Sequence, residues 1–281
     1  AVSRYYKSGK AEVQAIKAGN DVVLMVEDIE SAIKKVKKAV WWRKIDKAEI
    51  DEHCRRVLAV KYWCGLHKPS FIDKRNIISD LNPPEAHLLH RTLVEKSLTL
   101  LQNRNNILPV KNLGKNRIAS VSIGRKNVTV FQESLSRYTK VTHFNIPKKC
   151  PKEIADSILA ELKNFDIVIV GIHKICMKPQ NRIFNVGVED DICESQLGFG
   201  LTKEMKTFVK NIISSNKAIV SYFGNPYSID KIMEVSKADA LLVAYQESVP
   251  SQDLAAQLIF GGIGASGKLP VSINKTYPAG T

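Results

Sequence analysis

Short continuous apolar runs alternate with segments of helical spacing through the second half of the chain. The runs predict strands at residues 118–123, 141–144, 167–171, 218–222, 240–245 and 269–273. The segments between them predict helices at residues 131–138, 151–164, 202–214, 228–235 and 251–260. Apolar strands joined by helices are typical of a parallel sheet that is buried on both faces. The pattern therefore predicts the α/β class: a three-layer α/β/α sandwich with a mostly parallel sheet of about six strands.

The first 66 residues show a different order of helix, strand and helices. Residues 10–18 are helical in composition, and Gly19 stands where a left-handed C-cap is needed. Residues 21–25 predict a short buried strand, and residues 29–36 repeat apolar side chains at helical spacing. Asp46 is suited to cap a further helix. Such a short piece cannot cover its own apolar faces, so we expect it to need a partner outside the chain.

Two stretches connect these regions or interrupt them. Residues 67–84 are polar, contain three prolines and predict a linker, and Pro84 suits the first turn of a helix over residues 85–101. Residues 174–200 are too long for an ordinary connection between a strand and a helix. They predict a functional or irregular insertion.

Composition removes several classes of protein. None of the apolar runs in the 281 residues approaches the roughly 20 residues of a membrane span. The net charge of +14 is compatible with nucleic-acid binding, but the lysines cluster on amphipathic helices and no nucleic-acid motif accompanies them. A solvated face is the favoured interpretation. The five cysteines lack Cys-x-x-Cys spacing, which favours reduced, mostly buried thiols over a zinc site or a disulfide framework.

Motifs for cofactors and metals are weak. No glycine-rich phosphate loop follows the first sandwich strand, and the glycines of residues 261–267 come after a helix, which indicates a chain reversal. His87 and His90 have a spacing that could serve a metal, but no matching third ligand stands nearby. The acidic run 189–191 could supply a general acid or a cation site, although a helix cap explains it better. We expect neither a cofactor nor a metal.

Two polar segments follow neighbouring strands of the predicted sheet. Gly224-Asn225-Pro226-Tyr227 follows the strand at 218–222, and Gln246-Glu247 follows the strand at 240–245. Open α/β sheets bind ligands at the carboxyl ends of their strands. Asn225 and Gln246 are therefore candidate binding residues, although loop structure alone would also account for these segments.

Four stretches together resemble family 3 glycoside hydrolases, closest to the bacterial β-N-acetylhexosaminidase branch. They are Ala18-Gly-Asn-Asp-Val-Val-Leu-Met25, Arg55-Arg-Val-Leu-Ala-Val-Lys-Tyr62, Ser97-Leu-Thr-Leu-Leu-Gln-Asn-Arg-Asn-Asn-Ile-Leu-Pro109 and Gly261-Gly-Ile-Gly-Ala-Ser-Gly-Lys-Leu-Pro-Val271. The resemblance implies that residues 1–66 are the C-terminal end of a (β/α)8 barrel. Residues 67–96 would then be a linker and connecting helix, and residues 97–281 the family's C-terminal α/β sandwich domain.

The resemblance also implies the chemistry of the parent protein. We expect a retaining hydrolase of terminal N-acetyl-β-glucosaminides whose catalytic aspartate and Asp-His pair lie upstream of Ala1. The chain alone is then expected to be inactive, with the barrel as its intramolecular partner and carbohydrate as the substrate. Met25, Val26 and Glu27 would lie on the barrel rim, and Met25 and Glu27 are candidate sugar contacts. The related β-glucosidases take an acid/base glutamate from a sandwich motif that the loop around Glu189 does not match.

The ends of the chain and its alternatives complete these expectations. The chain begins with Ala rather than Met, which predicts a processed or cut N-terminus, and Tyr277-Pro-Ala-Gly reads as the opening of a linker to another domain. The resemblance leaves the compartment open and is compatible with export to a bacterial periplasm. The alternative is a stand-alone carbohydrate-binding or protein-interaction module. A third hypothesis, a basic nucleic-acid binder, predicts affinity that falls steeply with salt.

Overall fold

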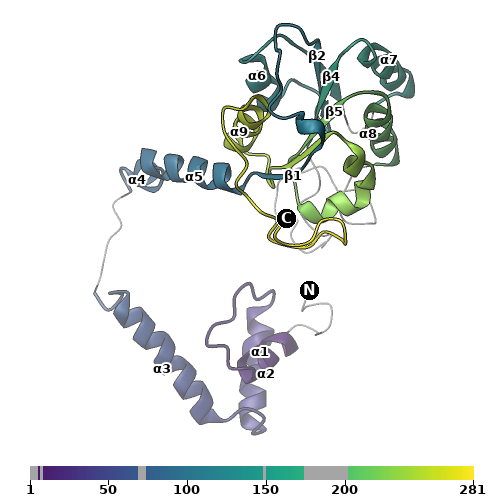
Figure 1. The fold of residues 1–281 in the computed structure, drawn as a ribbon. Coiled ribbons are helices and arrows are strands. Elements are labelled where there is room, and N and C mark those ends of the chain that lie inside the picture. The colour runs from purple at the N-terminus through teal and green to yellow at the C-terminus, as the bar shows by residue number, and fades with distance from the viewer. Residues whose placement is uncertain (1–5, 7–8, 69–73, 148–149, 174–201) are drawn as a thin grey trace. The chain divides into compact units, whose positions relative to one another are not determined.

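The computed structural model of the chain describes residues 6, 9–68, 74–147, 150–173 and 202–281. It divides into two compact units, with the boundary between Leu81 and Asn82 (Figure 1). The predicted insertion at 174–200, including Glu189, lies outside the described residues.

Unit 1 is helical. Its elements are α1 (Lys10–Lys17), α2 (Ile29–Trp41), α3 (Lys47–Trp63) and α4 (Ile77–Leu81). Asp28 caps α2 by accepting from the Ser31 N–H at 2.9 Å, and Asp46 caps α3, as predicted, by accepting from the Ala48 N–H at 3.0 Å. Gly19 has a φ of +88°, as its place after α1 requires.

The strand predicted at residues 21–25 does not form. The described part of unit 1 contains no strand, so the backbone groups of this segment have no ladder to join. Leu24 and Met25 are instead 79% and 76% exposed, and Met25 has a positive φ of 59°. The prediction was wrong because an apolar run becomes a strand only beside a neighbouring strand.

Unit 2 alternates strands and helices. Its elements are α5 (Pro84–Ser97), β1 (Thr99–Asn103), η2 (Arg104–Asn106), β2 (Ile118–Ile123), α6 (Val130–Ser136), β3 (Val141–Ile146), α7 (Lys152–Leu162), β4 (Ile167–Ile172), α8 (Lys203–Ser215), β5 (Ala218–Tyr222), η3 (Pro226–Lys237), β6 (Ala240–Val243) and α9 (Val249–Phe260). The six-stranded sheet has the order β1-β6-β5-β4-β2-β3. All neighbours are parallel except β1, which pairs antiparallel with β6 at the edge.

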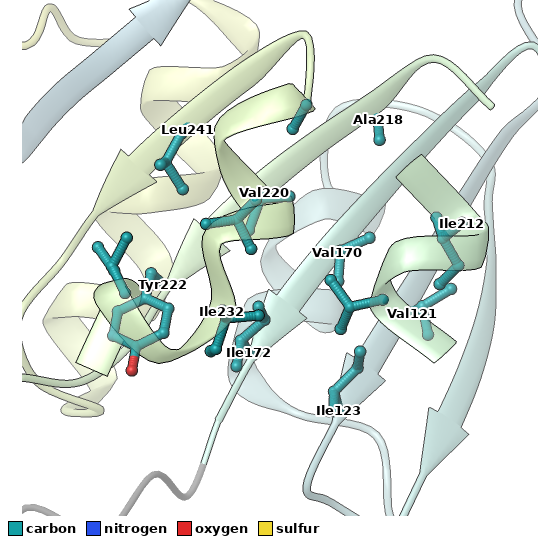
Figure 2. Close-up of a cluster of buried hydrophobic side chains, with 14 of the residues drawn as sticks. Val121, Ile123, Val170, Ile172, Ile212, Ala218, Val220, Tyr222, Ile232 and Leu241 are labelled. Atoms are coloured by element: carbon teal, nitrogen blue, oxygen red, sulfur yellow. The ribbon is translucent and has the colours of Figure 1, made fainter. Parts of the chain in front are cut away.

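Both faces of the sheet are covered, which gives the predicted α/β/α sandwich. Alternate strand residues pack on one face with α7, α8 and η3, and on the other with α5, α6 and α9. Figure 2 shows the first face, where Val121, Val170 and Val220 of three adjacent strands meet Ile212 of α8 and Ile232 of η3. Every residue of β2, β4, β5 and β6 is buried, because helices cover both faces of these strands. This burial accounts for the continuous apolar runs in the sequence.

Two sandwich elements differ from their prediction. The helix expected over 85–101 ends at Ser97. Residues 99–103 form strand β1 instead, an edge strand of the sheet that the sequence did not predict. The strand expected at 269–273 is absent from the sheet. Leu269 pairs with the chain end instead, donating its N–H to the Thr281 carbonyl and accepting from the Gly280 N–H, both at 2.8 Å. Pro270 follows without an N–H for a ladder.

The glycine cluster before this segment reverses the chain, as expected. Gly261 ends α9 with a φ of +81°. Gly267 donates its N–H to the Leu98 carbonyl at 3.0 Å, and a Cβ at this position would lie 2.4 Å from the Ser97 carbonyl oxygen. Only a residue without a side chain fits this approach.

Candidate functional site at the carboxyl edge of the sheet

Parallel strands bring their carboxyl ends to one edge of the sheet, and several polar residues of unit 2 follow those ends. Arg125 comes two residues after β2, and His173 comes directly after β4. Asn225 follows β5, and Gln246 and Glu247 follow β6. This edge is where open α/β sheets bind ligands.

An ion-pair network joins three of these connections. Glu247 Oε1 accepts from Arg125 Nε at 2.7 Å and lies 2.5 Å from a terminal nitrogen of the same guanidinium. The same oxygen lies 3.0 Å from His173 Nδ1. The Glu247 side chain is 16% exposed, and that of His173 is fully buried. One carboxylate oxygen therefore ties together the chain segments that leave β2, β4 and β6.

Burial and pairing fix the charges of the network. Burial lowers the pKa of His173 below its ordinary value, against the opposite effect of Glu247. Burial pushes the pKa of Glu247 up, but the hydrogen bonds from His173 and Arg125 outweigh it and leave that pKa below its usual range. At neutral pH the network is therefore a carboxylate, a guanidinium and a neutral imidazole.

The geometry argues against general acid/base chemistry by this pair. With His173 Nδ1–H donating to Glu247, Nε2 is the acceptor, and among the described residues it has no hydrogen-bond partner. Nε2 lies over Gly171, since a Cβ there would stand 2.6 Å away, and the ring stacks on Phe223 with centroids 4.7 Å apart. Among the described residues, the acceptor nitrogen of this imidazole is therefore buried rather than presented to solvent. A general acid also needs a raised pKa, and Glu247 has a lowered one.

The two binding residues predicted in the sandwich lie at neighbouring strand ends. Asn225 is half-buried, and its side-chain oxygen caps η3 by accepting from the Tyr227 N–H at 3.0 Å. Gln246 is also half-buried, and its side chain makes no hydrogen bond to any residue that the structure describes. An amide group of this kind can both donate to and accept from a hydroxyl group.

The two binding residues predicted on the barrel rim lie in unit 1. Met25 and Glu27 are both exposed and stand between α1 and α2. The candidates therefore fall into two pairs, one in each unit.

A polar cluster in unit 1 joins the segment between α1 and α2 to helix α3. Asp21 Oδ1 accepts from Arg56 Nε at 2.9 Å and contacts His53 Nδ1 at 2.5 Å. These bonds, that from Arg56 first, lower the pKa of Asp21 to about 2. Polar contacts of Asp21 with Arg56 and His53 thus tie the segment before α2 to α3.

Sequence reasoning did not single out Arg125 or His173 as site residues, and it named Glu247 only beside Gln246. The signal was present, because a charged or titratable side chain follows each of three buried apolar runs within a few residues. The sequence pattern does not show that Glu247 pairs with Arg125 and His173. Strands β2 and β6 are separated in the sheet by β4 and β5, and only the fold shows that one side chain spans them.

Other predicted features take simpler roles. His87 and His90 are exposed on α5. Cys54 of α3 and Cys64, which follows that helix, are exposed rather than buried as predicted. Across the described ranges no three potential metal ligands gather at one point. No helix in those ranges is long and apolar enough to span a bilayer.

Comparison with known proteins decides the family. The profile described as the glycosyl hydrolase family 3 C-terminal domain matches residues 98–279. The chain belongs to glycosyl hydrolase family 3. The match covers the sheet and its helices from α6 to α9, including the edge with Arg125, His173 and Glu247.

Curated relatives within the family are longer than this chain. It is 26% identical over 259 residues to a β-xylosidase of Formosa agariphila, covering 79% of the chain and 33% of that relative. It is 21% identical over 314 residues to a periplasmic β-glucosidase of Salmonella typhimurium, covering 93% of the chain and 38% of that relative. The chain thus spans 33% and 38% of the lengths of these two proteins.

A solved structure shares the fold. The family 3 β-N-acetylglucosaminidase of Paenibacillus sp. superposes with a TM-score of 0.68 at 20% identity, covering 97% of the chain and 49% of that protein. At this identity the likeness shows the fold alone.

Proposed function

We propose that this family 3 chain is the C-terminal part of a retaining glycoside hydrolase and is inactive alone. The observation that carries the proposal is the family match over residues 98–279 in a chain spanning 33% to 38% of two curated glycosidases. Residues 1–66 would complete a (β/α)8 barrel, residues 67–96 would connect the domains, and the catalytic carboxylates would lie before Ala1. In this arrangement Asn225 and Gln246 contact carbohydrate from the sandwich, and Met25 and Glu27 from the barrel rim.

The apolar surface of unit 1 supports a barrel partner. Large apolar side chains on its helices and connections are more than half exposed: Val22, Leu24, Met25, Ile29, Trp41, Trp42, Leu58, Val60, Tyr62, Trp63 and Leu66. Folded domains seldom leave so many large apolar groups in water. Burying them against further barrel elements would account for the pattern.

The first candidate substrate is a terminal N-acetyl-β-glucosaminide. The chain's own motifs resemble the hexosaminidase branch, and the loop around Glu189 does not match the acid/base motif of the β-glucosidases. The second candidate is a β-xyloside or β-glucoside, which is favoured by the names of the curated relatives.

The test is an assay of the protein made from its native gene beside the 281-residue chain. We expect the native protein to release nitrophenol fastest from the N-acetyl-β-glucosaminide among the matched glucosaminide, xyloside and glucoside, and the chain to release none. Faster release from the xyloside or glucoside would select the second candidate. Activity of the chain itself would overturn the proposal that it is inactive alone. A native protein no longer than the chain, without activity, would overturn the proposal in favour of a stand-alone binding module.

A further inference from the structure

Glu247 stands where the chain turns sharply out of the sheet. Gln246 donates its N–H to the Ala244 carbonyl at 2.6 Å across Tyr245, whose φ is +60°. A three-residue turn closed in this way is a γ-turn of the uncommon positive-φ kind. A tyrosine adopts this conformation only where its surroundings hold it there. Gln246, the candidate sugar contact, is the last residue of the turn.

Contacts hold the turn on both sides. Before Gln246, the Tyr245 hydroxyl hydrogen-bonds to Thr99 Oγ1 of β1 at 2.7 Å. After Gln246, the Glu247 carboxylate is held by Arg125 and His173, and its backbone carbonyl accepts from the Gln252 side-chain amide at 3.4 Å. Gln246 itself contributes no side-chain hydrogen bond to any described residue. Its position is therefore set by its neighbours.

We propose that Glu247 is a positioning residue whose paired carboxylate holds the turn at 244–247. It thereby keeps Gln246 at the end of β6, next to the strand β5 that Asn225 follows, for a carbohydrate hydroxyl. The part that concerns carbohydrate rests on the proposed function, and the part that concerns the turn does not. Both partners of the carboxylate are anchored, since His173 is fully buried and Arg125 follows β2. The carboxylate thus fixes the turn to the far strands of the sheet.

Two other roles fit the structure less well. A catalytic dyad would need the imidazole to reach a substrate, and His173 Nε2 is enclosed over Gly171. A purely stabilising ion pair would have no specific effect on Gln246. Asp253 is the matched control for a purely stabilising ion pair. Its side chain is also 16% exposed, and it pairs with Arg91 at 2.8 Å and with Arg137 at 3.3 Å. Asp253 lies in α9, away from the carboxyl edge of the sheet.

The experiment uses amide NMR spectra and hydrogen exchange of the 281-residue chain and of its Glu247→Gln and Asp253→Asn variants. Losing a hydrogen-bonded charge exposes local backbone bonds, so we expect Glu247→Gln to speed exchange at the Gln246 amide by roughly tenfold and to move the Gln246 and Asn225 side-chain signals. Asp253→Asn is expected to leave these signals in place. Core amides of β4 and β5 should keep their protection in both variants.

Arg125→Lys covers the case in which Glu247→Gln fails to fold. It keeps the charge but loses the two-nitrogen contact with Oε1, so a smaller change of the same signals is expected. Unchanged Gln246 signals in the folded variant, or equal changes in Asp253→Asn, would overturn the positioning role.

Carbohydrate is added separately, as millimolar N-acetylglucosamine, xylose or glucose. We expect one sugar to shift the Gln246 and Asn225 signals of the wild-type chain and to need several-fold higher concentration in Glu247→Gln. If no sugar shifts the wild-type signals while Glu247→Gln still moves them, the carbohydrate contact is wrong and the positioning of the turn stands. Equal sugar affinity in both chains would overturn the link between the turn and binding.

Discussion

Helices α2 and α8 have the same length of 13 residues and a similar amphipathic pattern, but they differ in how much of their apolar face is buried. In unit 1, α2 buries only Ala32 and Ala39. In unit 2, α8 buries Met205, Phe208, Val209 and Ile212 against the sheet. An amphipathic pattern thus states which face of a helix requires cover, and a sheet or another layer has to supply it. Unit 2 contains that layer, and the described part of unit 1 does not.

The largest test of this contrast uses the tryptophans as a probe of unit 1 alone. Trp41, Trp42 and Trp63 all lie there and are 80%, 56% and 85% exposed. In urea we expect the circular dichroism of the sandwich to be lost in one cooperative step of roughly 5 to 15 kcal/mol. Tryptophan emission should start red-shifted and change little. A tryptophan transition that coincides with the dichroism would show that unit 1 has a core of its own.

A core truncation should separate the units next. Ile172→Ala removes a fully buried side chain between strands and helices, and we expect about 3 to 4 kcal/mol loss of unfolding free energy. Leu24→Ala in unit 1 removes a side chain that is 79% exposed and should change it by less than about 0.5 kcal/mol. Chemical denaturation of both variants measures the difference. Equal effects would contradict the contrast.

A pair of glycines sharpens the comparison within unit 2. Gly267→Ala would drive a methyl group against the Ser97 and Leu98 carbonyl oxygens, so we expect about 2 to 3 kcal/mol loss of unfolding free energy. Gly264→Ala is the control, because nothing lies within 4 Å of the point that its new methyl group would occupy, and the φ there is ordinary. Thermal unfolding should place the control near the wild type. A stable Gly267→Ala would mean that this close approach is absent in solution.

The smallest expected effect concerns the polar cluster of Asp21, His53 and Arg56 in unit 1. Because hydrogen bonds from Arg56 and His53 hold the pKa of Asp21 at about 2, the charged form favours the folded unit. This stabilisation is present above the ordinary carboxyl range and is lost as the pH falls toward about 2. Carbon NMR of the Asp21 carboxyl group should show a midpoint near this value. A midpoint near 3.8, the ordinary value, would mean that the cluster is open.

Some residues of the candidate site follow from the sequence pattern of buried strands, and others are found only in the folded structure. The places of Asn225 and Gln246 at the carboxyl ends of β5 and β6 were predictable, because each follows a buried apolar run that is typical of a parallel strand. His173 and Arg125 were not, since a single charged residue after a strand is commonplace and their shared partner Glu247 is 74 and 122 residues away along the chain. Pairing between distant residues requires the order of the strands.

Local periodicity by itself determined the α/β class, the α-helices of both units other than α4, and five of the six strands, because a buried layer imposes its period on the residues that form it. Tertiary structure alone decided the rest. Residues 21–25 lack a strand to pair with, residues 99–103 leave the helical pattern to pair with β6, and residues 269–273 pair with the chain end. A strand is completed by hydrogen bonds to a neighbour, and the neighbour is chosen by the fold rather than by the segment.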